Sequence, residues 1–431
     1  MKKIAIFWFR RDLRLEDNIG LFKALNSSNP VLPIFIFDEQ ITSKLPRDDA
    51  RINFIYNSLK ELDRQLKKNG SSLLVLKGKP LEVWKNLTKN FEIEQVFFNR
   101  DYEPYAIERD TKITDFLKSK SICFFSFKDQ VIFEKYEVLK KDNTPYTVFS
   151  PYKKQWLHLF DKAEHTHFYN CQKHLLKAFK IQIKFPDLMQ LGFTASNVKT
   201  KPFNMSDLAL YEQIRNYPAL NKTSNLSPYL RFGQISIRQT VKKALLYSPS
   251  FLSQLIWREF FMQILYHFPR VVSQCFKPQY ETVKWINNKD EFELWCKGKT
   301  GYPLVDAGMI QLNTTGYMHN RVRMLTASFL CKHLLINWRW GEAYFAQKLL
   351  DYDLASNNGN WQWAAGTGCD AVPYFRIFNP NEQLKKFDSD FKYTKKWISN
   401  LNELSYPKPI VEHKFARERA INAFKKASEN C

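Results

Sequence analysis

The chain has 431 residues, of which 44% are hydrophobic and 25% are charged. This balance is typical of a globular protein, and the length allows two or three domains. Lysine and arginine outnumber aspartate and glutamate by 65 to 43, a net charge of +22. So large a positive charge favours a polyanionic partner, either nucleic acid or an anionic lipid surface.

Several classes of protein are excluded by what the chain lacks. No apolar run approaches the roughly 18–20 residues of a membrane span, and no lipidation motif or basic amphipathic helix supports a lipid surface. The apolar stretch Ile4–Phe9 is too short for a secretory signal. The seven cysteines form no CxxC pair, so neither a disulfide framework nor a zinc cluster is expected. We expect a cytoplasmic protein without a metal or a membrane partner.

Residues 1–130 alternate between apolar runs rich in β-formers and helical patterns. Alternation of this kind predicts an α/β domain with a parallel, Rossmann-like sheet that is covered on both faces. The expected helices include Arg51–Asn69 and Pro104–Ser119. The expected strands are Ile4–Phe9, Val31–Phe37, Leu73–Leu76, Val96–Phe98 and Ile122–Phe127.

The rest of the chain has a different pattern. Residues 131–201 carry polar runs without a clear period, which we interpret as a connector between two domains. Residues 202–431 are predicted to form an all-α domain. Its expected helices are Asp207–Tyr217, Ser236–Leu246, Phe251–Phe268, Leu304–Asn313, Met318–Leu335 and Glu342–Leu350.

Common catalytic motifs do not account for this chain. No G-x-G-x-x-G follows a strand, so the sheet lacks the dinucleotide fingerprint. No G-x-S-x-G elbow is present, and His165 and His167 do not stand in an H-E-x-x-H frame. A hydrolase or a metalloenzyme is therefore poorly supported.

Two segments of the helical half have an unusual composition. Thr223–Leu230 places three hydroxyls before a proline, which suits phosphate binding as well as an ordinary capped turn. In Gln254–Phe261, Trp257 and Phe261 share one helical face, while Arg258 and Glu259 lie off it. The ordinary alternative is a core helix with a solvated ion pair.

Two later segments point to a polar ligand. Asn320, Arg323 and Met324 share a helical face, which suits either a ligand pocket or a partly exposed helix. Asp351 and Asp353 precede an Asn/Gly-rich segment. These two carboxylates either close a helix or accept hydrogen bonds from a heterocycle and pair with Arg323. Seven of the eleven tryptophans fall between residues 257 and 363, where they can fill a core or stack on a flavin or on bases.

Longer segments of the sequence make the functional interpretation specific. The segment Trp8–Asn18 resembles the opening strand and loop of the photolyase/cryptochrome family. The segments Trp361–Ala365 and Tyr374–Pro380 resemble its C-terminal signature. The resemblance covers nearly the whole chain and is strongest to class I cyclobutane pyrimidine dimer (CPD) DNA photolyases.

This resemblance implies one FAD per chain inside the helical domain. Asn357 would lie near flavin N5, Arg323 and Asp351 would form an ion pair near the isoalloxazine ring, and Asp353 would hydrogen-bond that ring. The residues that the resemblance assigns to the cofactor are Tyr211, Thr223, Ser224, Asn225, Leu226, Ser227, Arg323, Asp351, Tyr352, Asp353 and Asn357.

The resemblance also implies an electron relay and a substrate surface. Trp361, Trp338 and Trp285 match the family's tryptophan chain. Damaged DNA would be the partner, bound with an extruded dimer by a monomeric protein. The residues assigned to the lesion or the DNA backbone are Arg215, Gln254, Trp257, Arg258, Asn320, Arg321, Met324, Trp363 and Gln383.

Some positions depart from the family's pattern. Gln254 stands where CPD photolyases usually carry a Glu that hydrogen-bonds the dimer, and Phe251 stands where a Trp is often found. Asn320 replaces the His of (6-4) photolyases, so that lesion class is disfavoured. Tyr105 and Ala106 replace the Asn and Glu that bind folate, so a deazaflavin, another flavin or no antenna pigment remain open.

The expected function is light-driven repair of CPD lesions by electron transfer from photoexcited reduced FAD. The alternative is a blue-light-sensing, cryptochrome-type flavoprotein. A nucleic-acid-binding module without light chemistry is a third reading.

Overall fold

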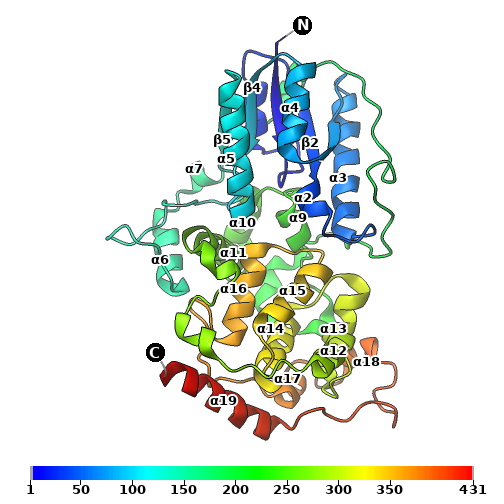
Figure 1. Cartoon of the computed structure of the whole chain (residues 1–431), viewed down its shortest axis with the longest axis vertical. Helices are drawn as coiled ribbons and strands as arrows, with labels where there is room; N and C mark the ends of the chain where they lie inside the picture. The colour runs from blue at the N-terminus through cyan, green and yellow to red at the C-terminus, as the bar shows by residue number, and fades with distance from the viewer. Residues whose placement is uncertain (1–2, 430–431) are drawn as a thin grey trace. The chain divides into compact units, whose positions relative to one another are not determined.

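The computed structural model describes residues 3–429 and separates into two compact units. Figure 1 traces the chain through them. Of the described residues, the first unit contains those up to Glu137, with Leu159–Lys201 and Leu226–Leu246. The second contains Val138–His158, Pro202–Asn225 and the residues from Tyr247 onward. Among residues 3–429, no helix has the length and apolar character needed to cross a membrane.

The first unit is built on a five-stranded sheet in the order β3-β2-β1-β4-β5, in which all pairs are parallel. The two strands β1 and β2 are buried along their whole length, as expected where both faces of a sheet are covered. The prediction of an α/β domain with a parallel sheet is therefore confirmed. The strands are β1 (Ile4–Phe9), β2 (Val31–Asp38), β3 (Leu74–Gly78), β4 (Ile93–Asn99) and β5 (Cys123–Phe127).

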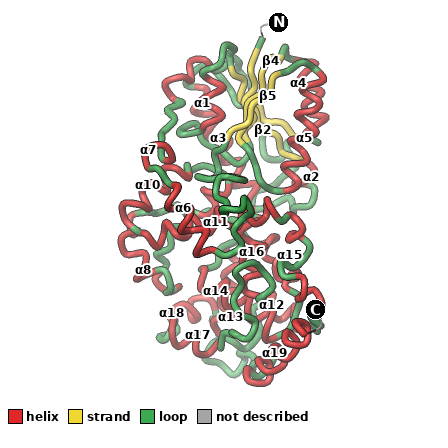
Figure 2. The backbone as a smooth tube through the Cα atoms, turned by 90° about the vertical axis from the view of Figure 1, so that its left-hand side faces the viewer, coloured by secondary structure: helices red, strands yellow, loops and turns green. Residues whose placement is uncertain are grey.

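Helices cover both faces of this sheet. Figure 2 shows α4 and α5 together on one side and α1 on the other. On the α4 and α5 side, Trp84 packs edge-on against Trp8 with ring centroids 5.7 Å apart. The helices of this unit are α1 (Ile19–Leu25), α2 (Glu39–Thr42), α3 (Ala50–Lys67), α4 (Pro80–Asn90), α5 (Pro104–Ser119), α7 (Lys162–His165), α9 (Ser227–Arg231) and α10 (Ile237–Tyr247).

The opening segment after β1 forms a buried ionic network. Asp129 accepts bonds from Arg14 at 2.7 Å and from Arg238 at 2.9 Å. Burial alone would raise the pKa of Asp129, but the two guanidinium groups hold it below its usual value. Asn18 caps α1 and accepts a bond from the Asn99 amide at 2.8 Å. This part of the family motif therefore holds the N-terminal unit together.

The second unit is helical. Its core gathers aromatic and aliphatic side chains between Cys275 and Ala427 around buried Trp295, Trp338 and Trp361. Its main helices are α6 (Phe149–Leu159), α8 (Tyr211–Ile214), α11 (Pro249–His267), α12 (Lys289–Lys297), α13 (Pro303–Thr315), α14 (Asn320–Ser328), α15 (Trp338–Lys348), α16 (Leu354–Ala365), α17 (Pro380–Phe387), α18 (Lys392–Trp397) and α19 (His413–Glu429). A π-helical turn, η6 (Phe329–His333), follows α14.

Three local expectations were wrong. The single helix expected over Asp207–Tyr217 is a 3-10 turn followed by the short α8. The Asn/Gly-rich segment around Asn357, for which no helix was expected, lies inside α16, which Asp353 caps at its N-terminus. Glu259 is not part of a solvated ion pair: it is 3% exposed and accepts a 2.6 Å bond from the Trp156 indole.

Candidate functional site

An ion pair joins the start of the α16 region to α14. Arg323 Nη2 lies 2.9 Å from Asp351 Oδ2, and Asp351 is buried. The Arg323 Nε donates to the Met318 carbonyl at 2.8 Å, which fixes the plane of the guanidinium. A paired charge held this way is a preorganised partner for a polar ring edge. Tyr352, between the two aspartates, packs against the hydrophobic core.

The first turn of α16 carries two more polar groups. Asp353 is the N-cap and accepts from the Ser356 amide at 3.0 Å. One turn further on, the Asn357 amide donates to the Glu342 carboxyl at 2.9 Å and to its carbonyl at 3.1 Å. Burial raises the pKa of Glu342, although the bond from Asn357 opposes this rise. Glu342 therefore fixes the orientation of the Asn357 amide.

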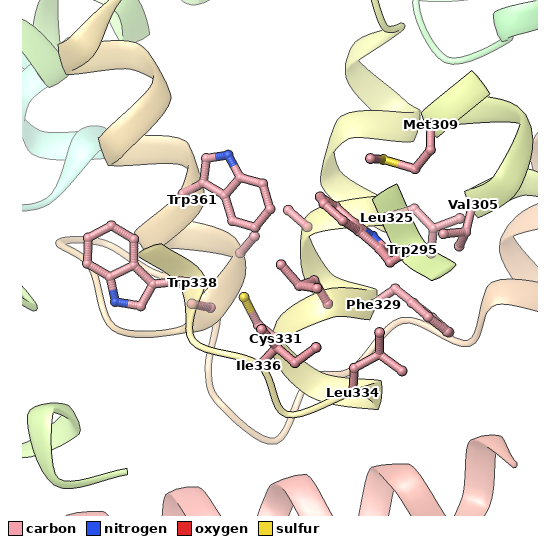
Figure 3. Packing of buried hydrophobic residues seen from close by; sticks show 14 of the residues in the cluster. Trp295, Val305, Met309, Leu325, Phe329, Cys331, Leu334, Ile336, Trp338 and Trp361 are labelled. Carbon is pink, nitrogen blue, oxygen red and sulfur yellow. The ribbon is translucent and has the colours of Figure 1, made fainter. Parts of the chain in front are cut away.

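Trp361 lies on the same helix, buried in the core. Figure 3 shows Trp338 and Trp295 on opposite sides of it. A Cβ at Gly341 would collide with the Trp361 ring, so this glycine lets α15 and α16 approach closely. The Trp361 and Trp295 ring centroids are 6.2 Å apart. Trp295 was not singled out from the sequence. The signal that could have identified it is its position among the tryptophans clustered between residues 257 and 363.

Trp285, the third member of the expected relay, lies at the border of this core. It is partly buried and packs edge-on against Phe424 of α19, with centroids 5.7 Å apart. Trp338 opens α15 and is fully buried. The structure therefore places all three relay candidates in or against one hydrophobic cluster.

The residues expected to hold the FAD diphosphate fall in two groups. Tyr211 packs edge-on against Phe251 and lies under the Arg215 guanidinium, and burial raises the pKa of its hydroxyl. Thr223, Ser224 and Asn225 form an accessible turn in which Asn225 has φ +50°. Leu226 and Ser227 belong to the other unit, where Ser227 begins α9.

The residues expected to face a lesion on α11 lie on its partly exposed side. Trp257 stacks face to face on Phe149 of α6, with centroids 3.7 Å apart and planes 10° from parallel. The Gln254 amide donates only a long 3.5 Å bond to the Ser250 carbonyl. Arg258 is also partly exposed, and Trp363 of α16 packs on the edge of the core.

A cluster of cationic groups surrounds the start of α14. Arg321 donates to Asn216 at 2.6 Å and stacks on Phe387, while its buried Nε has no partner among the described residues. Burial and the neighbouring arginines lower the pKa of His319 to about 4, so this N-cap residue is neutral at pH 7. Next to it, Asn320 contacts Met324 sulfur at 3.8 Å.

Gln383 lies on α17, where its backbone amide donates to the Asn379 carbonyl. Its side chain is partly exposed. Within residues 3–429, no group of three or more His, Cys, Asp or Glu side chains is arranged to hold a metal ion.

Comparison with known proteins defines the class of this fold and site. The model of the FAD binding domain of DNA photolyase matches residues 251–405, and the DNA photolyase model matches residues 5–170. A crystal structure of a cryptochrome from Synechocystis shares the fold with a TM-score of 0.85 at 24% identity. The class is that of the photolyase and cryptochrome flavoproteins.

Closer relatives narrow this class. A deoxyribodipyrimidine photo-lyase from Synechococcus is 36% identical over 96% of this chain and 95% of its own length. The Escherichia coli enzyme of that name is 35% identical over 98% of each chain. A bacterial class III photolyase from Agrobacterium tumefaciens matches with a TM-score of 0.89, 32% identity and coverage of 100% and 98%. The chain belongs to the DNA photolyase family.

A further solved relative concerns the cofactors. An archaeal photolyase from Sulfolobus tokodaii, 34% identical with a TM-score of 0.85 over 98% of this chain and 99% of its own, was solved with two FAD molecules. That structure was described as implying a novel light-harvesting cofactor. The expectation of an FAD-binding helical domain is confirmed.

Proposed function

We propose that this protein, acting as a cytoplasmic monomer, uses light to split cyclobutane pyrimidine dimers in DNA. The observation that carries the proposal is the set of polar groups on and before α16, which combines the Arg323–Asp351 pair, the Asp353 cap and the Asn357 amide. These groups stand on the helix that also carries Trp361 and Trp363.

The residues present fit a flavin. The edge of an isoalloxazine ring alternates carbonyl acceptors with N–H donors and ring nitrogens, and it needs both kinds of partner. Arg323 supplies donors, Asp353 supplies acceptors, and the Asn357 amide supplies a further acceptor, its Oδ1. Glu342 accepts both bonds from the Nδ2 of Asn357, so the Oδ1 is the atom that this amide can offer the ring. Thr223 and Ser224 would hold phosphate oxygens.

When bound and reduced, FAD supplies a light-driven one-electron donor, which is chemistry that amino-acid side chains do not provide. The chain's own task is to orient this donor and to surround it with fixed charges. The Arg323 cation, paired with Asp351, favours an electron-rich ring nearby. Trp361, Trp338 and Trp285 would replace electrons lost from the site, because indole is an easily oxidised side chain.

Substrate binding follows from the charges and aromatic faces. Burial and the nearby Arg215 charge lower the pKa of Arg321, whose buried Nε has no hydrogen-bond partner among residues 3–429. A DNA phosphate would relieve both costs. Trp257 and Trp363 offer aromatic surfaces for an extruded dimer, while Asn320 and Met324 would contact its polar and apolar edges. Arg258 and Gln383 would contact the backbone.

The test is repair itself. Protein with reduced FAD should convert a dimer-containing oligonucleotide to the undamaged sequence in blue light but not in the dark. Size-exclusion chromatography of the same sample should give the mass of one chain. Failure to restore the oligonucleotide with fully reduced, fully loaded protein would remove the proposal.

The departure at Gln254 gives a prediction. Gln254→Glu should raise the yield of repair about two- to threefold, because a carboxyl group forms stronger hydrogen bonds to a charged dimer than an amide does. Repair per absorbed photon would measure the change, and dark affinity for damaged DNA serves as the control. The neighbouring substitution Ser253→Ala should leave the yield unchanged. An unaltered or lower yield in Gln254→Glu would show that this residue does not contact the dimer.

A further inference from the structure

Trp257 is closely packed among the aromatic rings of the helical unit. Phe149 covers one of its faces at 3.7 Å between centroids, with the planes 10° apart. Phe260 meets the Trp257 ring edge-on at 5.6 Å, and Phe261 lies against it at 5.3 Å. Phe149 is itself buried. The face of Trp257 that Phe149 covers is therefore closed to a base.

The helix that carries Phe149 is tied to the helix that carries Trp257. Glu259, two residues after Trp257, accepts a 2.6 Å bond from Trp156 and a 3.4 Å bond from the Tyr152 hydroxyl. All three side chains are buried. A buried carboxylate with two such donors is costly to displace, so α6 cannot slide or rotate freely along α11.

A second hydrogen bond holds α6 in place, and its acceptor follows α16, the helix that carries Trp363. Asp370, in the loop after α16, accepts a 3.0 Å bond from the backbone amide of Phe149. This bond satisfies the first amide of α6, which has no partner within its own helix. Trp363 belongs to α16, so Asp370 connects the segment that follows this helix to α6, which carries the ring stacked on Trp257.

We propose that Phe149, placed by Asp370, is a positioning residue that fixes the plane of Trp257 and leaves one defined face for the flipped dimer. The inference rests on the proposed function, because it takes Trp257 to be a ring on which the lesion stacks. Phe149 does not touch the dimer in this arrangement. It acts by removing the rotational freedom that Trp257 would otherwise lose on binding.

The test compares dark binding to two duplexes of one sequence, with and without a single dimer. Phe149→Leu keeps much of the apolar volume but removes the flat ring. It should weaken binding to the dimer duplex about five- to tenfold, the usual value of an aromatic pair, and leave binding to the undamaged duplex unchanged. The FAD content and absorption spectrum should also stay unchanged.

Two further variants separate positioning from general packing. Asp370→Ala should reproduce part of the loss, while Asp370→Asn should restore binding, because its amide oxygen can still accept the Phe149 N–H. Phe97→Leu is the matched control, since it removes a stacked ring from the sheet of the other unit. It should not alter the preference for the dimer.

The outcomes distinguish the two claims. If the unmodified protein binds both duplexes equally, the proposed function fails and the inference fails with it. If the unmodified protein prefers the dimer and Phe149→Leu keeps the full preference, the inference alone is overturned. Parallel loss of affinity for both duplexes, or loss of FAD, would show that Phe149 only supports packing and would also overturn it.

Discussion

Lys332→Met should raise the free energy of unfolding by several kcal/mol at pH 6 and remove a rise in stability between about pH 7 and pH 10. Lys332 lies in the π-helical turn η6 with a fully buried side chain. Its Nζ has no hydrogen-bond partner among the described residues and lies 3.3 Å from the centroid of the Phe424 ring. The π face offsets only part of the lost hydration.

The direction of this change in stability with pH follows from the pKa of Lys332. Burial lowers the pKa of Lys332 from 10.5 to about 7. Cys331 on the same turn gives little help, because burial raises the pKa of its thiol to about 12 and keeps it neutral. Below pH 7 both the folded and the unfolded chain hold the proton, so the folded state bears the full cost of a buried ammonium. That cost is on the order of 4–5 kcal/mol and disappears as the pH rises through 7 to 10.5.

Urea denaturation at pH 6 and pH 9 measures both effects. Methionine has a similar length and no charge, so it should fill the same space. Lys299→Met, at an exposed position, is the matched control and should change neither the stability nor its pH dependence. A variant that is less stable than the parent at pH 6 would mean that the ammonium has a strong partner, and the interpretation would be wrong.

The parts of the fold that depend on local pattern were predictable. Pro104–Ser119 forms the expected helix because proline starts it and apolar residues recur at helical spacing. The strands β1 and β2 were visible as continuous apolar runs, since strands inside a sheet that is covered on both faces bury the side chains of both faces.

Helices that depend on tertiary contacts were not predictable. The sequence of α16 is rich in Asn, Ser and Gly, which are poor helix formers. The helix forms because Asp353 caps it, Gly366 ends it with φ +84°, and its neighbours pack closely on it. At Gly359, for instance, a Cβ would collide with the Phe261 ring. α6 was likewise missed, because its stability comes from the buried Glu259 on another helix.

In the candidate site, too, the residues that follow a local pattern were predictable and those that depend on tertiary contacts were not. The sequence identified Arg323 and Asp351, and the structure joins them in an ion pair, because the helical spacing and the charges were visible. Glu342 was not identified, since only the packing of α15 on α16 brings it to the Asn357 amide. The contact of Phe149 with Trp257 was also hidden, because their separation in sequence gives no pattern to read.

Trp361→Phe should slow the photoreduction of oxidised, bound FAD at least about tenfold and leave repair by pre-reduced protein largely intact. Phenylalanine is much harder to oxidise than indole, so the residue next to the proposed flavin-binding groups of α16 could no longer pass an electron inward. Repair does not need this relay once the cofactor is already reduced. Bleaching of the blue absorption under illumination with an external reductant measures the first rate, and dimer loss measures the second.

Trp295→Phe is the matched control, because Trp295 is equally buried and in ring contact with Trp361 but lies outside the proposed relay. If the relay runs through Trp338 and Trp285, Trp295→Phe should keep nearly the parent rate. A loss as large as that of Trp361→Phe would instead route electrons through Trp295, which shares the ring neighbour Phe292 with Trp340. Equal loss of photoreduction and repair in Trp361→Phe would contradict a relay role and leave Trp361 as a packing residue.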